Sequence, residues 1–293
     1  MVKIFSHSRL KTFEQCPLKF KYKYIDKIKP EFESSIESHL GKCVHDSLEW
    51  IYNSVKKEKI PSIDEVIKYY SVRWEETWKE DTKIVKNHLN IKDYFNKGVE
   101  FLLNYYMKHQ PFKDGTIDCE RKIIIELDKE NGYHLQGFID RLVYNKETGE
   151  YEVHDYKTAN NLPSREDVEK DRQLALYSIA IKEIFGRDKD VCLVWHYLAH
   201  NTKICIKKTN EDLRKLKKDV LELINKIENA KDFPPCKSIL CNWCEYKSMC
   251  PVFGGKLNER QQKIEDCRKN EQLNENIEKS EEIQEETNNK TRE

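Results

Sequence analysis

The chain has 293 residues, 38% of them hydrophobic, which is enough for one sizeable α/β domain with insertions or for two small domains. Its 52 basic and 52 acidic side chains balance, so no overall basic field indicates a nucleic-acid partner. Locally, residues 1–30 carry eight lysines and arginines against two acids, whereas residues 275–293 carry seven acids against three basic residues. The sequence contains no apolar run of about 18 residues and no apolar signal core, so we expect a cytoplasmic protein without a membrane span.

The first third of the chain has the apolar spacing of helices. Between Ser8 and Tyr24 the apolar side chains fall on one side, and Pro17 is expected to break or restart this helix. Ser62 and Asp64 are suitable N-caps for a later helix. In chain order, further helices are predicted over residues 36–55, 62–79 and 85–107.

The middle of the chain alternates in the manner of β-strands. Residues 117–127 and 133–144 are rich in strand formers, and residues 145–150, with Gly149, predict a turn into a strand over residues 151–157. The elements predicted after this hairpin are a long helix over residues 164–185, strands over 191–198 and 203–208, and a helix over 211–230. This order predicts an α/β fold with a central mixed sheet flanked by helices.

Two aspartates and a lysine in the predicted hairpin have the pattern of a metal-dependent nuclease. Asp155 and Lys157 are two residues apart in a strand, so their side chains project to one face while Tyr156 points away. The turn would bring Asp140 near Asp155, and a Mg²⁺ or Mn²⁺ ion between the two carboxylates would relieve their repulsion. The ammonium of Lys157 suits orienting a metal-activated water or stabilising phosphoryl charge. The alternative is an ordinary surface hairpin with a salt bridge, because Asp-x-Lys is a common tripeptide.

Residues around the hairpin favour the nuclease interpretation. Gln173 and Tyr177 lie one turn apart on the following helix, so both would face the same way. Glu120 lies in the strand before Asp140, and His45 lies in an early helix. Taken singly, each has an ordinary explanation, such as a helix surface or a packed core histidine.

In this order, the motifs resemble those of the RecB-like branch of the PD-(D/E)xK nuclease superfamily. The matching positions, which extend to about Pro251, are Ser8-Arg9-Leu10, Phe13, Cys16-Pro17, Gly41, His45, Glu120, Gly137 to Arg141, Asp155-Tyr156-Lys157-Thr158, Gln173 and Tyr177. The resemblance implies a restriction-endonuclease-like core with a helical N-terminal insertion. It is strongest to the iron–sulfur exonucleases of this branch, which include the CRISPR-associated adaptation nucleases.

The resemblance also implies roles for individual residues. Lys157 would be the catalytic lysine, acting with Asp140 and Asp155. The ligands of Mg²⁺ or Mn²⁺ would be His45, Asp140, Asp155 and the backbone carbonyl of Tyr156. The residues that position the substrate would be Gln173, Tyr177 and, as a substrate-side or outer-sphere acid, Glu120.

Ten cysteines in a chain expected to be cytoplasmic indicate metal binding rather than a disulfide framework. Cys241, Cys244 and Cys250 form C-x₂-C-x₅-C, a spacing at which three thiolates bind one metal centre. For the fourth ligand, loop closure costs about 5 kcal/mol for the distant Cys16 against roughly 1.4 kcal/mol for the local Cys236. Chain entropy alone therefore favours Cys236.

The resemblance favours Cys16 instead, because the iron–sulfur members of this branch pair an N-terminal Cys-Pro with a C-terminal cysteine triplet. It implies a [4Fe–4S] cluster held by Cys16, Cys241, Cys244 and Cys250. Structural Zn²⁺ is the alternative, since the spacing does not separate the two. The other cysteines are expected to be free thiols, namely Cys43, Cys119, Cys192, Cys205 and Cys267.

These observations predict both an organisation and a function. The expected segments are residues 1–30 with the first cluster cysteine, 31–112 as a helical region carrying His45, 113–210 as the nuclease core, 211–253 as the C-terminal helix and cluster cysteines, and 254–293 as a polar, disordered tail. We expect a metal-dependent DNA exonuclease, a phosphodiester hydrolase that acts on single strands or DNA ends in DNA repair, recombination or CRISPR adaptation.

DNA is the expected partner, with a protein partner in the same pathway. Lys19, Lys21 and Lys23 are candidates for phosphate contacts, although a solvated helix face explains them equally well. The chain has no G-x-x-x-x-G-K-[ST] loop, so it is not expected to be a helicase. The alternative function is a non-catalytic nucleic-acid-binding or assembly subunit whose acidic tail docks a partner.

Overall fold

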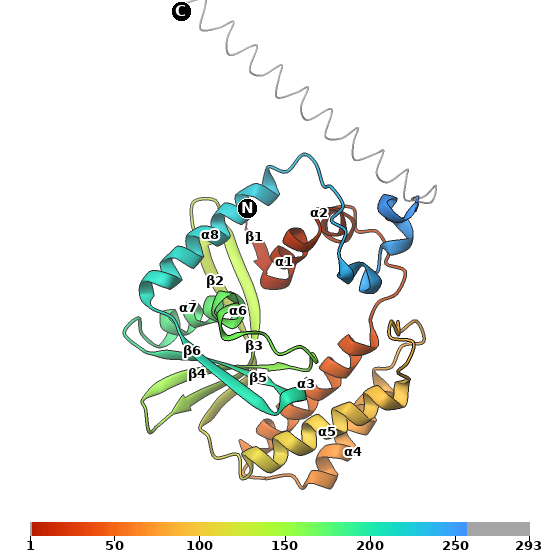
Figure 1. The fold of residues 1–293 in the computed structure, drawn as a ribbon. Helices are drawn as coiled ribbons and strands as arrows, with labels where there is room; N and C mark the ends of the chain where they lie inside the picture. The colour runs from red at the N-terminus through yellow and green to blue at the C-terminus, as the bar shows by residue number, and fades with distance from the viewer. Residues whose placement is uncertain (1, 257–293) are drawn as a thin grey trace, which may run out of the picture. The chain divides into compact units, whose positions relative to one another are not determined.

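A computed structural model describes residues 2–256 of the chain. The predicted tail over residues 254–293 lies almost entirely outside these residues, and so does Cys267. The backbone divides into two compact units (Figure 1). Within the described residues, the sheet unit consists of residues 2–14 and 32–231, and the cysteine unit consists of residues 15–31 and 232–256.

The sheet unit is built on six strands. Their bounds are β1 Lys3–Ser6, β2 Thr116–Asp128, β3 Tyr133–Asn145, β4 Glu150–Lys157, β5 Val191–Tyr197 and β6 Thr202–Lys207. Along one edge, β3 pairs antiparallel with β2, and along the other it pairs parallel with β1 and antiparallel with β4. Beyond β4 the sheet continues through a parallel β5 and an antiparallel β6. The predicted mixed sheet is therefore confirmed.

Two strands share one edge of β3, and a gap separates them. β1 pairs with residues 133–136 of β3, and β4 pairs with residues 141–145. Residues 137–140 have no partner in either of these two registers, and we call them the β3 gap. Because β1 runs parallel to β3 and β4 runs antiparallel to it, the carboxyl ends of β1 and β4 both point toward the β3 gap.

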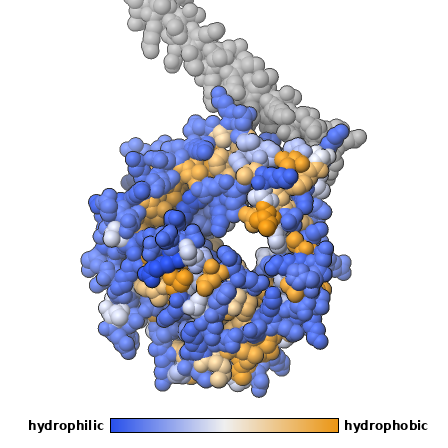
Figure 2. All heavy atoms as spheres, in the orientation of Figure 1, coloured by the Kyte–Doolittle hydropathy of each residue, from blue (hydrophilic) through white to orange (hydrophobic). Residues whose placement is uncertain are grey.

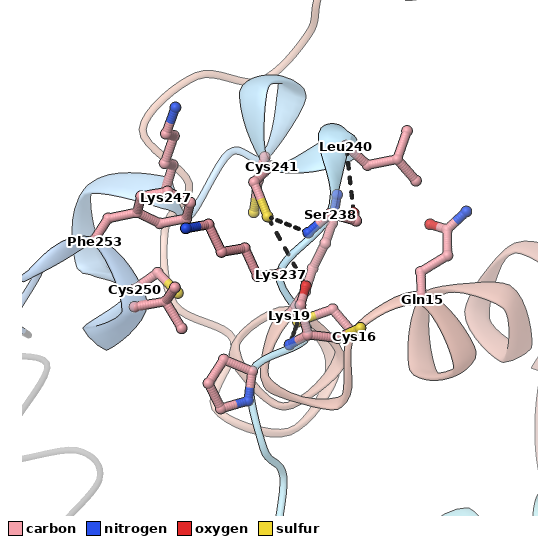
Figure 3. Close-up of a pocket in the computed structure, with 14 residues that line it drawn as sticks. Gln15, Cys16, Lys19, Lys237, Ser238, Leu240, Cys241, Lys247, Cys250 and Phe253 are labelled. Atoms are coloured by element: carbon pink, nitrogen blue, oxygen red, sulfur yellow. Dashed lines mark hydrogen bonds between the residues drawn. The ribbon is translucent and has the colours of Figure 1, made fainter.

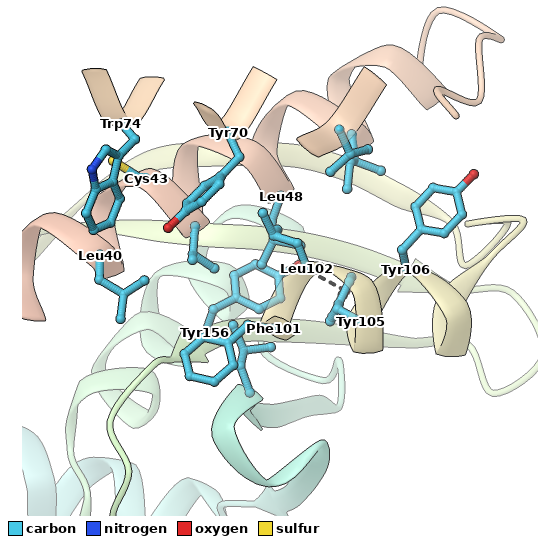
Figure 4. Close-up of a cluster of buried hydrophobic side chains, with 14 of the residues drawn as sticks. Leu40, Cys43, Leu48, Tyr70, Trp74, Phe101, Leu102, Tyr105, Tyr106 and Tyr156 are labelled. Carbon is cyan, nitrogen blue, oxygen red and sulfur yellow. Dashed lines mark hydrogen bonds between the residues drawn. The ribbon is translucent and has the colours of Figure 1, made fainter. Parts of the chain in front are cut away.

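Helices cover both faces of the sheet. Their bounds are α1 His7–Gln15, α3 Ile36–Val55, α4 Ile63–Glu76, α5 Ile91–His109, α6 Arg165–Lys170, α7 Gln173–Phe185 and α8 Asn210–Glu228. α3, α4 and α5 pack on one another around an aromatic-rich core that Tyr156 of β4 joins (Figure 4). The next residue of β4, Lys157, contacts α7, so α7 lies on the opposite face. α8 packs on α7 and β2.

Three elements differ from the prediction. The helix expected over residues 164–185 is two helices, because Asp171 has an extended backbone and its Oδ1 accepts a hydrogen bond from the N–H of Gln173 at 2.8 Å. α5 begins at Ile91, where Asn90 and Asp93 form a capping box, rather than at residue 85. The four-residue strand β1 is absent from the prediction.

A buried polar network fixes β3, β4 and β5 together on the face toward α3 and α5. Arg141 is 1% exposed, pairs with Asp114 and donates a hydrogen bond to Nδ1 of His154 at 2.8 Å. That Nδ1 also lies 2.8 Å from Nε2 of His196, and Nε2 of His154 lies 2.9 Å from Glu152. Burial lowers the pKa of both histidines, so both are neutral at pH 7. Nδ1 of His154 then accepts, and its Nε2 donates to Glu152.

The cysteine unit brings together two segments that are far apart in the sequence. Its helices are α2 Pro17–Phe20, the π-helix Lys21–Ile25 and the 3₁₀ helices Ile239–Trp243, Lys247–Met249 and Pro251–Phe253. The N–H of Leu18 donates to the carbonyl of Pro234 at 3.3 Å, and the rings of Phe20 and Phe233 stack with centroids 6.4 Å apart. α2 begins at Pro17, as the predicted restart requires.

Hydrophilic side chains cover much of the face drawn in Figure 2, with apolar side chains in separate patches. Among the exposed apolar residues of the sheet unit are Phe138 and Ile124, on the neighbouring strands β3 and β2. Within residues 2–256, no helix has the length and apolar character that a membrane crossing requires.

Candidate active site and cysteine centre

The residues predicted to form the active site lie around the β3 gap. They are Asp140 on β3, Asp155 and Lys157 at the carboxyl end of β4, His45 on α3, and Gln173 and Tyr177 on α7. Asp140 directly precedes Arg141, and Asp155 directly follows His154, the register partner of Arg141, so both aspartates lie just beyond the last β3–β4 pair. The hairpin therefore brings the two carboxylates to neighbouring strands, as expected.

His45 connects the helical layer to both strands. Its Nε2 lies 2.7 Å from the carbonyl oxygen of Tyr156, and its Nδ1 lies 3.3 Å from Oδ2 of Asp140. The N–H of Tyr156 donates to the same carboxyl oxygen at 2.9 Å. If Nε2 carries the proton for the Tyr156 carbonyl, Nδ1 presents a lone pair to the Asp140 carboxylate. A metal ion between them would bind both the Nδ1 lone pair and the Asp140 carboxylate.

Glu120 lies closer to the candidate metal ligands than its predicted outer role requires. One ligand atom from each of His45, Glu120 and Asp140 lies within 4.8 Å of the other two. Glu120 falls between the β2–β3 pairs 119–141 and 121–139, which puts it opposite Asp140. Its φ of 47° is in the left-handed region, a strained conformation for a residue with a side chain. The donor atoms of these three residues form a potential metal site.

Lys157 is held between two acceptors. Its Nζ lies 2.7 Å from Oδ2 of Asp155 and donates to Oε1 of Gln173 at 3.2 Å. Burial acts to lower the pKa of Lys157, but Asp155, together with Asp171 and Asp140, outweighs burial, so the pKa is raised. Lys157 is therefore a cation at neutral pH, suited to binding an anion rather than accepting a proton.

Gly137 allows Tyr177 to lie against β3. A Cβ built on Gly137 would come within 2.3 Å of the Tyr177 ring, so a larger residue would have to displace this ring. Burial raises the pKa of Tyr177, partly offset by hydrogen bonds with the Gln173 side chain and the Phe138 backbone. The phenol is therefore protonated at neutral pH, and its contact with Gln173 agrees with their predicted common face.

Carboxyl groups crowd the metal-binding side of the site. Burial raises the pKa of Asp140 to about 7, with His45 opposing the shift and Asp155 adding to it. Burial also raises the pKa of Glu120, again with His45 opposing. Ionising these carboxyls together therefore costs free energy, which a divalent cation would offset. Carboxylates with one imidazole suit Mg²⁺ or Mn²⁺ as a donor set.

His7 lies near the site, although the sequence analysis does not identify it. It is the first residue of α1 and directly follows β1, whose carboxyl end points toward the β3 gap. Burial lowers its pKa to about 4, and it interacts electrostatically with Asp171, Arg172 and Lys157. Its Nδ1 is buried without a hydrogen-bond partner among the described residues. Its place immediately before Ser8-Arg9-Leu10 is the sequence signal that points to it.

In the cysteine unit, five cysteines line one pocket (Figure 3), namely Cys16, Cys236, Cys241, Cys244 and Cys250. The N–H of Cys236 donates to Sγ of Cys16 at 3.4 Å, and the N–H of Ser238 donates to Sγ of Cys241 at the same distance. Cys236 is exposed, whereas the other four are half-buried. The remaining described cysteines form no disulfide, namely Cys43, Cys119, Cys192 and Cys205.

The N-terminal lysines of the cysteine unit are paired with acids. Lys19 and Lys23 lie 2.6 and 3.4 Å from the carboxylate of Glu245. Lys21 lies 2.9 Å from Asp26. These ion pairs compete with any phosphate for the three ammonium groups, so the expected phosphate contacts gain no support from this arrangement.

Gly137→Ala should destabilise the protein by about 1–3 kcal/mol, because the new methyl group collides with the Tyr177 ring. Urea denaturation measures this change. The double variant Gly137→Ala/Tyr177→Ala should be no less stable than Tyr177→Ala alone, since the ring is gone. Additive losses in the double variant would contradict the steric explanation.

Asp140→Asn should stabilise the metal-free protein by about 1–3 kcal/mol at pH 8, because it removes a carboxylate whose pKa is raised by burial. The gain should shrink as the pH falls below 7, where the wild-type carboxyl becomes neutral. Denaturation with divalent cations removed measures both. Asp128→Asn is the control without a gain, since hydrogen bonds from Asn131 lower the pKa of Asp128. An equal loss of stability in Asp140→Asn and Asp128→Asn would contradict the claim that the ionised Asp140 carboxylate destabilises the metal-free protein.

Comparison with known proteins finds two solved structures and one family model that this chain matches. Among solved structures, a candidate exonuclease from Eubacterium rectale is 16% identical, has a TM-score of 0.46, and the match covers 82% of this chain and 86% of that one. The protein SSO0001 is 15% identical, with a TM-score of 0.40 and coverage of 88% and 90%. Residues 4–251 match the family model of the PD-(D/E)XK nuclease superfamily. The chain therefore belongs to the PD-(D/E)XK nuclease superfamily.

Proposed function

We propose that this nuclease is a metal-dependent exonuclease of single-stranded DNA or DNA ends, acting in DNA repair, recombination or CRISPR adaptation. One observation carries the proposal: His45 of α3 contacts both Asp140 and the carbonyl of Tyr156 at the β3 gap. Asp155 and Lys157 lie on either side of Tyr156 in β4, whose N–H donates to Asp140. A nucleic-acid substrate follows from the family, and the RecB-like motifs favour DNA.

The proposed metal ligands are His45, Asp140, Asp155 and the carbonyl of Tyr156, with Glu120 close enough to join them. A bound Mg²⁺ or Mn²⁺ ion would polarise the phosphate and lower the pKa of the attacking water. The protein prepares for this ion by holding Asp140 between the N–H of Tyr156 and the imidazole of His45. Crowded carboxyls then become ligands instead of a destabilising cluster.

Lys157 is the proposed catalytic lysine. Its charge is maintained by Asp155, and Gln173 limits where the ammonium can point. A fixed cation near the reacting phosphate stabilises the negative charge that develops on its oxygens, or orients the attacking water. Gln173 and Tyr177 are proposed to position the substrate next to this lysine, since both lie at the start of α7.

For the cysteine pocket, we infer a [4Fe–4S] cluster held by Cys16, Cys241, Cys244 and Cys250. An all-thiol donor set fits such a cluster, and N–H groups directed at sulfur stabilise cluster thiolates. Cys16 shares the half-buried environment of the triplet, whereas Cys236 is exposed and gives its N–H to Cys16. These observations support Cys16 as the fourth ligand, with Zn²⁺ as the alternative occupant.

Lys157→Ala should reduce the kcat of Mg²⁺-dependent cleavage of labelled single-stranded DNA by about 10²- to 10³-fold or more, because the variant loses the fixed cation. DNA affinity and metal content should remain close to those of the wild type. Lys68→Ala, an exposed lysine on α4, is the matched control and should retain full turnover. Unchanged turnover in Lys157→Ala would refute the assigned site.

The same digestion tests the alternative function. A wild-type protein that binds DNA but cleaves neither single strands nor ends with Mg²⁺ or Mn²⁺ would be a non-catalytic binding or assembly subunit. Cleavage that begins at a free end, and that is lost on a circular single strand, would identify an exonuclease.

Cys16→Ser should lower the iron and sulfide content of the purified protein and weaken its brown colour, whereas Cys236→Ser should leave both near the wild-type level. Elemental analysis and visible absorption measure the difference. The opposite pattern would make Cys236 the fourth ligand. A colourless wild-type protein with stoichiometric zinc would overturn the cluster itself.

A further inference from the structure

The outer face of β2 and β3 continues from the metal-binding residues into a row of exposed side chains. At one end of the row, Glu120 and Asp140 face each other across the two strands. Side chains two residues apart on a strand share a face, so Phe138 lies on the face of Asp140, about 7 Å along β3. Lys122 pairs with Phe138 in the register and lies next to Glu120 on the same face.

The next step of the row is also exposed. Ile124 of β2 pairs with Gln136 of β3, and Gln136 pairs in turn with Ser6 of β1. Phe138 is 46% exposed and Ile124 is 52% exposed. Their neighbours in the chain that point to the other face, such as Ile139 and Ile123, are buried. The exposed apolar side chains therefore belong to a solvent-facing row and not to the edge of the core.

The row also presents a positive charge. The side chain of Lys122 is exposed, and its ammonium pairs with no carboxylate within the described part of the chain. It lies directly across the strands from Phe138. An aromatic ring, an aliphatic side chain and an available cation therefore lie together on one face, and the row begins at the proposed metal site.

We propose that this face, the β2–β3 platform formed by Lys122, Ile124, Gln136 and Phe138, binds single-stranded DNA with one base stacked on Phe138. Lys122 contacts the adjacent phosphate, and Ile124 packs against the next base. The proposal rests on the proposed function, because it assigns the path by which the substrate reaches that same site.

The chemistry of the platform selects single strands over duplex. A duplex keeps its base faces stacked inside, so a flat aromatic ring on a strand can reach only unpaired bases. Stacking tolerates any base, which suits an enzyme that removes successive nucleotides. One lysine supplies little of the electrostatic attraction that duplex binding requires, so contacts with the bases carry the affinity.

Continuity with the site argues for nucleic acid over a protein occupant. The Tyr177 side chain hydrogen-bonds to the Phe138 backbone, so the strand that carries the platform borders a residue proposed to position the substrate. The Phe138 side chain itself points to the other face of the sheet from Gly137 and the Tyr177 ring. The metal-site end of the row is acidic, which suits a metal-bound phosphate, and its middle is cationic and apolar, which suits the neighbouring phosphate and base. A protein partner seated there would block the proposed site.

The test compares variants of the full-length protein on a labelled single-stranded oligonucleotide with Mn²⁺. Phe138→Ala should raise KM about 10- to 100-fold with kcat changed much less, because stacking contributes to binding. Phe138→Trp should restore KM to near the wild-type value. Ile124→Ala should have a smaller effect, and Ile184→Ala, which removes an equally exposed isoleucine from α7, should have none.

A second arm uses oligonucleotides that each carry one abasic unit at a different distance from the labelled end. The wild type should bind one of these oligonucleotides more weakly than the intact strand, because its abasic unit removes the base that stacks on Phe138. Phe138→Ala should bind that oligonucleotide and the intact strand equally well, since the variant already lacks the stacked ring. Fluorescence anisotropy measures DNA affinity in Lys157→Ala and in the double variant Lys157→Ala/Phe138→Ala, neither of which should cleave the strand. The double variant should bind more weakly, by the factor found for the KM of Phe138→Ala.

The outcomes separate this proposal from the proposed function. Absence of metal-dependent cleavage by the wild type would refute the nuclease assignment. The effect of Phe138→Ala on DNA affinity, measured by anisotropy, would still show whether the platform binds DNA. Cleavage and binding unchanged by Phe138→Ala would refute the platform while the nuclease stands. A wild-type dimer that becomes monomeric in Phe138→Ala, with unchanged KM, would show that the face binds a second copy of the chain instead.

Discussion

The candidate active site depends on one constraint of sheet geometry, which is that β1 and β4 share a single edge of β3 and leave residues 137–140 between them. A strand edge without a partner normally invites further pairing. Here the Tyr177 ring packs against Gly137 of the gap, which the missing side chain of Gly137 permits. The end of β4 borders the rest. The gap therefore gives Asp140 room to face His45, and it brings the ends of two strands to one place.

Tyr156 connects the helical layer to the site, because its side chain packs among the helices and its backbone contacts the site residues. Its N–H and carbonyl contact Asp140 and His45, while its hydroxyl lies 3.2 Å from that of Tyr105, which is 2.7 Å from that of Tyr52. These hydroxyls are buried, so each needs the others as hydrogen-bond partners. A site held from behind in this way loses little conformational entropy when a ligand binds.

Local sequence signals predicted most of the elements, and the tertiary arrangement decided the rest. The helix over residues 36–55 and the hairpin were predictable because their apolar periodicity and turn residues lie within each segment. The break at Asp171 was not, because apolar periodicity continues through it while the Asp171 side chain caps the next helix. The closeness of Glu120 to His45, and of His7 to Lys157, arises only when helices and strands that are distant in the sequence pack together.

The cysteine unit has a consequence for biosynthesis, because its two segments enclose the sheet unit in the sequence. Cys16 leaves the ribosome early, whereas the cysteines from Cys236 onward follow only after the last helix of the sheet unit. Domains generally fold as their chains emerge, so the sheet can form while Cys16 still has no companions. The thiol pocket is thus assembled only after the sheet unit, and until the segment from Cys236 onward emerges, Cys16 lacks the thiols that line the pocket with it.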